Sequence, residues 1–155
     1  MKILLTGATG YIGKRLLPVL IEAGHHVACC VRYIERFDPP ESLKSNLSVI
    51  QLDLLDKASL NHIPKDIDGA YYLVHSMSAS TKYKQLEHDS AVNFRNAMKQ
   101  TNVKHVVYLS GIINDNNLST HLASRKNVEI QLSKGTYNFT TLRAGIIIGS
   151  GSASF

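Results

Sequence analysis

The stretch that decides the fold is residues 2–32, which read KILLTGATGYIGKRLLPVLIEAGHHVACCVR. Apolar runs at residues 3–5 and 27–31 predict two strands, and the segment between them predicts a helix. Gly7, Gly10 and Gly13 occupy the junction of the first strand and the helix. Glycines at this spacing let the chain turn tightly, let a pyrophosphate approach the backbone, and let the helix pack close to the sheet.

The start of this helix predicts a ligand as well as a turn. Its first N–H groups and the positive end of its dipole point toward whatever lies on the glycine turn. Because the turn stands between a strand and a helix, we expect a nicotinamide dinucleotide as the ligand. The alternative is a glycine-rich turn that binds nothing.

Strand-like and helix-like segments continue to alternate along the chain. Further strands are predicted at residues 48–52, 70–74 and 105–109 and near Arg143, and helices at 82–101 and 119–133. A brief helix at 57–62 is expected with Asp56 as its N-cap. Helices between apolar strands require parallel pairing with right-handed crossovers. The predicted fold class is α/β: a doubly wound parallel sheet of about six strands with helices on both faces, a Rossmann fold.

Composition limits the class of protein. The 155 residues, 44% of them hydrophobic, suit one domain covering 1–155. No apolar run approaches the roughly 20 residues that span a bilayer, and the first strand leaves no room for a cleavable signal before it. The net charge of +5 comes from scattered residues, so we expect phosphorylated ligands and leave nucleic acid as a weak alternative.

The two cysteines, Cys29 and Cys30, are neighbours in a predicted strand. Their side chains should point to opposite faces, which disfavours a disulfide between them and favours a reducing, cytoplasmic setting. We expect one small core residue and one surface residue. Their spacing is not that of a redox pair or a metal site, so no metal is expected.

Four motifs in order resemble the atypical and extended short-chain dehydrogenase/reductase superfamily, in particular its NmrA-like NAD(P)-binding proteins and nucleoside-diphosphate-sugar epimerases. They are TGATGYIG at 6–13, Asp53-Leu54, YLSG at 108–111 and LRAG at 142–145. The resemblance covers essentially the whole chain. It implies that the substrate-binding region lies beyond Phe155, and that the protein pairs as a homodimer through its long helices.

The resemblance also implies cofactor contacts at particular positions. Asp53 would accept a hydrogen bond from the adenine amino group, with the Leu54 backbone beside it, and Ser110 would bind the substrate carbonyl or hydroxyl. Asp53 has an alternative role as a turn residue. The pyrophosphate would lie on Gly7, Thr9, Gly10, Tyr11, Ile12 and Gly13, and the wall along the adenosine would be Leu73, Val74 and His75. A strand-end histidine bonded to the backbone is an equal alternative for His75.

The end of the second predicted strand bears on the choice of dinucleotide. NAD-selective sites place an acid there to hold the ribose hydroxyls, whereas this strand ends in Arg32 and the first acid is Glu35. A guanidinium at this place favours a 2′-phosphate. We therefore expect NADP in preference to NAD. The alternative is that Arg32 caps the strand in solvent or stacks on the adenine.

The catalytic pair of the superfamily, Tyr-x-x-x-Lys, has no counterpart at the expected helix. His121 aligns with the tyrosine and Arg125 with the lysine, one helical turn apart. His121 can exchange protons near neutral pH, but a solvent-facing histidine is the more common case. Arg125 stays protonated and can bind ribose or phosphate. A frame shifted to Lys126 places Leu122 at the tyrosine position, and Tyr137 has no lysine four residues later.

Three functions remain open at this stage. The first is an NADP(H)-dependent oxidoreductase of atypical mechanism acting on an unknown small molecule, with catalysis by Ser110, His121 and Arg125. The second is a non-catalytic NmrA-like protein that senses the dinucleotide ratio. The third, a sugar-nucleotide epimerase or dehydratase, is disfavoured by the absent tyrosine and lysine. Fold alone does not choose among them.

Overall fold

A computed structural model describes residues 1–75, 82–112 and 119–151 of the chain. Strands and helices alternate as predicted. In order they are β1 (Lys2–Thr6), α1 (Tyr11–Glu22), β2 (His26–Val31), β3 (Leu47–Gln51), β4 (Gly69–Tyr72), α2 (Tyr83–Met98), β5 (His105–Gly111), α3 (Thr120–Leu132) and β6 (Asn138–Ala144). Three short 3₁₀ helices join them: η1 (Ile34–Arg36), η2 (Glu41–Asn46) and η3 (Ser59–His62).

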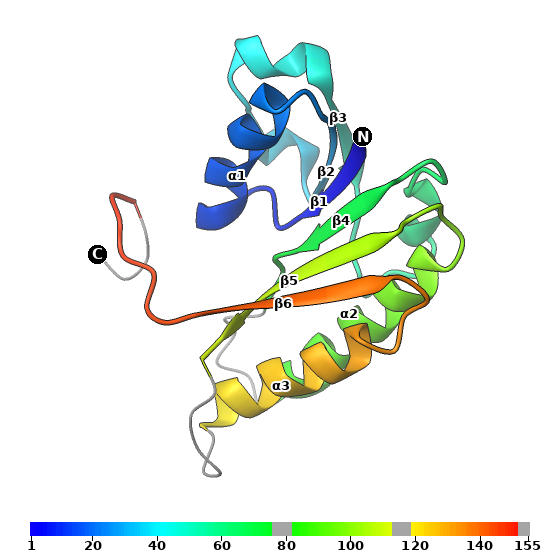
Figure 1. Cartoon of the computed structure of the whole chain (residues 1–155), viewed down its shortest axis with the longest axis vertical. Helices are drawn as coiled ribbons and strands as arrows, with labels where there is room; N and C mark the ends of the chain where they lie inside the picture. The colour runs from blue at the N-terminus through cyan, green and yellow to red at the C-terminus, as the bar shows by residue number, and fades with distance from the viewer. Residues whose placement is uncertain (76–81, 113–118, 152–155) are drawn as a thin grey trace.

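The strands form one sheet in the order β3-β2-β1-β4-β5-β6, and every neighbouring pair is parallel. The chain begins in the middle at β1, winds outward to β3, and then returns to β4 on the other side of β1 (Figure 1). The direction of winding therefore reverses between β1 and β4. This is the doubly wound Rossmann arrangement that the sequence predicts.

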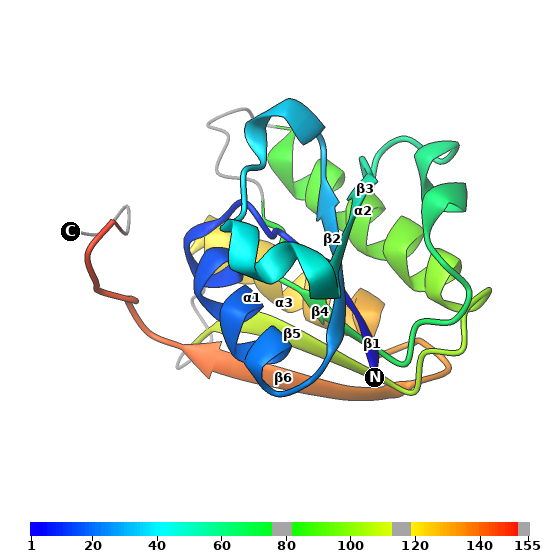
Figure 2. The same ribbon diagram turned by 90° about the horizontal axis from the view of Figure 1, so that it is seen from above.

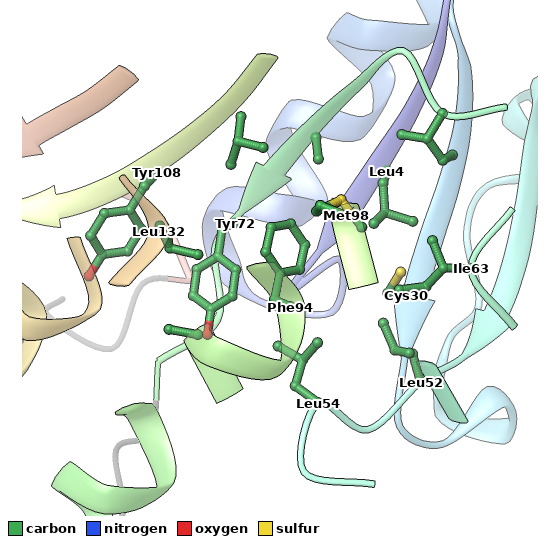
Figure 3. Packing of buried hydrophobic residues seen from close by; sticks show 14 of the residues in the cluster. Leu4, Cys30, Leu52, Leu54, Ile63, Tyr72, Phe94, Met98, Tyr108 and Leu132 are labelled. Atoms are coloured by element: carbon green, nitrogen blue, oxygen red, sulfur yellow. The ribbon is translucent and has the colours of Figure 1, made fainter. Parts of the chain in front are cut away.

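Helices cover both faces of the sheet, with α1 on one face and α2 and α3 on the other (Figures 1 and 2). Alternating strand residues supply the two cores, so that Leu5 packs in the cluster of α1 and Leu4 in that of α2 and α3. In the second cluster the rings of Tyr72 and Phe94 meet edge to face, 5.0 Å apart (Figure 3).

The two cysteines of β2 are buried on opposite faces of the sheet. Cys29 lies in the α1 core and Cys30 in the opposite core, and both cysteines are free, as the sequence indicates. The expectation that one of them lies on the surface is wrong, because both are buried. A parallel sheet with helices on each side buries both faces of its central strands.

Several element boundaries differ from the prediction, and three of the differences concern β4, α2 and η3. β4 ends at Tyr72, so Leu73 and Val74 follow the strand instead of belonging to it. α2 ends at Met98 and not at residue 101. The helix expected at 57–62 is the shorter η3, and Asp56 is not its N-cap: its Oδ1 accepts a hydrogen bond from the Ala58 N–H, which closes a turn before the helix.

Candidate functional site

A cleft of about 1260 Å³ opens at the carboxyl ends of the strands, where the winding reverses between β1 and β4. Doubly wound sheets bind their ligands at this position. The cleft brings together segments that lie far apart in the chain. The predicted cofactor residues all line it: Gly7, Thr9, Gly10, Tyr11, Ile12, Gly13, Arg32, Asp53, Leu54, Leu73, Val74 and His75.

The glycine turn has the geometry that its spacing predicts. Gly7 has a φ of +72°, and a Cβ there would stand 2.9 Å from the Leu73 carbonyl oxygen. At Gly13 a Cβ would stand 2.2 Å from the Gly7 carbonyl oxygen. The first glycine therefore allows the turn to pass against β4, and the third allows α1 to lie directly on the turn.

The start of α1 is open for an anion. Gly10 is the N-cap, no side chain caps the helix, and its first turn contains no acidic residue. The first N–H groups of a helix have no partner within it, and they attract negative charge. A phosphate group fits this position by charge and by hydrogen bonding.

Thr6 joins the two strands that flank the reversal point, a role that the sequence analysis missed. Its buried hydroxyl donates to the Tyr71 carbonyl oxygen at 3.0 Å and accepts from the Leu73 N–H at 3.2 Å. This side chain extends the backbone pairing of β1 and β4 into the floor of the cleft. The only signal in the sequence is a polar residue at the end of an apolar strand.

Asp53 lies beyond β3, at the end of the cleft where the adenine is expected. Its Oδ1 accepts from the Leu55 N–H at 2.9 Å, and the Ser59 hydroxyl bonds to both the N–H and the carbonyl of Asp53. The contacts within the chain are thus those of a turn residue, the alternative left open above. Arg32 is exposed at the same end, and it also lines a neighbouring cavity of about 320 Å³ together with Asp53 and Asp56.

The other end of the cleft lies at β4 and β5 and is lined by polar side chains, among them those of Ser110, His75 and Glu87. Ser110 is 1% exposed, and its Oγ has no hydrogen-bond partner among the described residues. His75 keeps part of its ring in solvent, yet its pKa is lowered by the surrounding protein and by the positive charge of Arg125. Glu87 of α2 is 7% exposed, and the Ser124 hydroxyl of α3 donates to its Oε2.

Glu87 is not among the site residues predicted from the sequence. A signal does exist, because Glu87 falls on the buried stripe of α2 together with Tyr83, Ala91 and Phe94. A carboxylate on the core side of a helix is costly to bury unless it is hydrogen-bonded or serves a site. Its neighbours on α3 satisfy the first condition, and its place in the cleft lining is consistent with the second.

The structure separates His121 from Arg125. Arg125 lines the cleft, whereas His121 is exposed, is not among the lining residues, and stacks its ring on Tyr83 at 5.0 Å. Tyr108 of β5 lies beside Arg125, and its hydroxyl donates to the Arg125 carbonyl at 3.4 Å. Burial raises the pKa of Tyr108 to about 12. Tyr108 therefore holds its proton at neutral pH.

This fold and this cleft define a dinucleotide-binding α/β domain. The model of the NAD(P)H-binding family matches residues 7–147, and the chain belongs to that family. The match begins at Gly7 and ends just after β6, so it includes the glycine turn and every lining residue of the cleft except Thr6 of β1.

Named relatives include reductases and epimerases. Cinnamoyl-CoA reductase 1 of Petunia hybrida is 33% identical over 118 residues, 69% of this chain and 34% of that protein. A nucleoside-diphosphate-sugar epimerase of Staphylococcus aureus has a TM-score of 0.76 at 25% identity, with 92% of this chain and 50% of that chain covered. A triphenylmethane reductase of Citrobacter sp., solved with NADP(H), has a TM-score of 0.76 at 19% identity, with coverage of 92% and 49%.

The chain spans about half the length of these solved structures and a third of the Petunia protein. Among the described residues, no helix combines the length and the apolar character needed to cross a membrane.

Proposed function

We propose that this chain is the cofactor-binding part of an NADP(H)-dependent oxidoreductase of the short-chain dehydrogenase/reductase superfamily. The observation that carries the proposal is the uncapped start of α1 above the glycine turn, in a cleft that also contains Arg32 and Ser110. The cofactor supplies the hydride, and the chain binds and orients it. The similarity to reductases and epimerases supports this class of chemistry.

The choice of NADP(H) over NAD(H) rests on Arg32. Arg32 directly follows β2 and lines both cavities at the adenine end. Asp53 and Asp56 line the smaller cavity, and their charges oppose a phosphate. The attraction of Arg32 for a 2′-phosphate must therefore exceed the repulsion from these two carboxylates. The preference for NADP(H) over NAD(H) thus depends on Arg32.

The test compares thermal unfolding with NADPH, with NADH and without ligand. A ligand at 100 times its Kd stabilises the native state by about 2.7 kcal/mol. We expect the larger shift with NADPH, and a reversed preference in Arg32→Asp. Arg36→Asp is the matched control, because Arg36 is exposed nearby, stacks on Tyr33 and does not line the cleft. Equal shifts with both cofactors in the wild type refute the assignment to NADP(H).

A second candidate is a non-catalytic protein that senses the NADP/NADPH ratio. The observation in its favour is that His121, which aligns with the catalytic tyrosine of the superfamily, lies away from the cleft lining. Turnover separates the two candidates, measured on full-length protein with NADPH and a panel of carbonyl, quinone and nucleotide-sugar compounds. Turnover that falls in His121→Ala supports a proton role for this residue. Tight NADPH binding without any turnover supports the sensor.

We further propose that the substrate-binding elements lie outside these 155 residues, since the similar solved structures are about twice as long. A homodimer through α2 and α3 and a cytoplasmic location complete the proposal. The location is consistent with two free, buried thiols. Sedimentation of the full-length protein tests the dimer.

A further inference from the structure

Arg125 is positioned in the cleft by three separate features. The Tyr108 hydroxyl donates to its backbone carbonyl at 3.4 Å, which ties this turn of α3 to β5. The neighbouring Ser124 donates to Glu87, which ties α3 to α2. Gly111 leaves room for Leu122 on the same helix, whose Cδ2 would stand 2.9 Å from a Cβ there, and Arg125 Nη1 would be in ordinary contact with that Cβ at 3.8 Å.

The guanidinium so positioned has no partner among the described residues. The ion pairs within 1–75, 82–112 and 119–151 are Lys2–Asp66, Lys44–Glu41 and Arg143–Glu129. Glu87, the carboxylate that lines this end of the cleft, is engaged by Ser124 and forms no ion pair with Arg125. A partly buried guanidinium without a carboxylate is costly unless a ligand supplies one.

The hydroxyl of Ser110 lacks a partner at the same strand end. Ser110 directly precedes Gly111, and its buried Oγ makes no hydrogen bond within the described chain. Buried hydroxyls are normally hydrogen-bonded. Arg125 and Ser110 line the same cleft. A planar fork of N–H groups together with a hydroxyl matches a carboxylate.

The phosphates of the cofactor have donors elsewhere. The glycine turn and the start of α1 follow β1, and two strand steps separate β1 from β5 in the sheet. At about 4.8 Å a step, the end of β5 lies roughly 10 Å from the pyrophosphate position. The anion at Arg125 is therefore a second ligand and not the pyrophosphate.

We propose that Arg125 and Ser110 form a carboxylate-binding subsite, so that the substrate carries a carboxylate close to its reacting carbonyl. The inference rests on the proposed function, because it assigns this anion to the substrate of a dinucleotide-dependent reaction. Arg125 is a specificity residue here, since it binds the carboxylate and transfers no proton.

The test uses benzoate as the probe and benzamide as its neutral counterpart. Both are titrated into the ¹⁵N-labelled chain, with and without saturating NADPH, and the Nε–H resonance of Arg125 is followed. We expect a saturable shift with benzoate and none with benzamide. In Arg125→Gln the affinity for benzoate falls by about tenfold or more, as for loss of a charge-assisted bond. Arg125→Lys keeps the positive charge but loses the planar fork of N–H groups. Its affinity for benzoate should lie between those of the wild type and Arg125→Gln.

Lys126→Gln is the matched control, since Lys126 is the exposed neighbour on α3 and loses the same charge. Its benzoate affinity should equal that of the wild type. No response of Arg125 to benzoate overturns the inference, and so does a tenfold loss of NADPH affinity in Arg125→Gln with benzoate binding intact. Benzoate binding in a wild type that binds no dinucleotide rejects the proposed function alone and leaves the carboxylate subsite standing.

Discussion

The substitution Gly13→Ala tests the physical role of the glycine turn. The added methyl group would stand 2.2 Å from the Gly7 carbonyl oxygen, 2.9 Å from the Gly7 carbonyl carbon and 2.9 Å from the Ala8 Cα. All three are backbone atoms, so no side chain can move aside. To reach even 3.0 Å from the oxygen, the two groups must separate by about 0.8 Å, the difference between 3.0 and 2.2.

A shift of this size acts on both stability and binding. α1 buries Leu17, Leu20 and Ile21 against the sheet, and moving the helix disturbs that packing. Overpacking of this kind costs about 1–3 kcal/mol, and we expect the upper end because the clash is with backbone. The shift also moves the amides at the start of α1 away from the phosphates. Loss of one such bond costs about 1.5–3 kcal/mol, which is more than tenfold in affinity.

The assay is urea unfolding together with calorimetric titration of NADPH. Gly69→Ala is the control, because a Cβ there would meet only the His105 carbonyl oxygen at an ordinary 3.7 Å. We expect the control to bind like the wild type. If Gly13→Ala stays within about 0.5 kcal/mol in stability and binds NADPH with unchanged affinity, the third glycine does not control the fit of α1 on the turn.

Three further outcomes test the cores and the floor of the cleft. Burial raises the pKa of Cys29 to about 12 and also raises the pKa of Cys30, whereas the thiols of the unfolded chain ionise near 9.0. The free energy of unfolding should therefore fall above about pH 9, by roughly 1.4 kcal/mol per pH unit for each thiol. Urea unfolding from pH 8 to 10 measures this fall, and a slope unchanged in Cys29→Ala contradicts it. Thr6→Val should cost about 1–3 kcal/mol, because it removes the hydrogen bonds of Thr6 to the Tyr71 carbonyl and to the Leu73 N–H. A neutral result by the same assay excludes a stabilising side-chain link from Thr6 to this segment. Ser110→Ala breaks no bond in the described chain and should stay within about 0.5 kcal/mol of the wild type, so a larger loss would reveal a partner for this hydroxyl.

Most of the fold was predictable because its signals are local. The alternation of apolar strands with helical segments requires parallel pairing, and six parallel strands are observed. The errors occur where tertiary contacts decide an outcome. Strand alternation alone predicted one of Cys29 and Cys30 on the surface, and helices on both faces of the sheet bury both. Asp56 has the chemistry of an N-cap, yet its side chain closes a turn ahead of η3.

The site was predictable to the extent that it is built from one contiguous motif. The spacing of the glycines determines the geometry of the turn. Residues of this turn line the cleft together with Arg32 and Asp53. Glu87 and Thr6 could not be assigned in the same way. Their roles depend on Ser124 of another helix and on Tyr71 of another strand, and nothing within a few residues of either position indicates those partners.

The sequence by itself determined that the chain forms a doubly wound sheet with a dinucleotide turn, because hydrophobic periodicity and glycine spacing act over short stretches. It also marked His121 and Arg125 as a pair one helical turn apart. Only the tertiary structure showed that the two side chains lie in different places: Arg125 lines the cleft, and His121 stacks on Tyr83. The physical reason is that α3 packs against Tyr108 and Glu87, which come from elements distant in the sequence, and this packing determines which side chain faces the cleft.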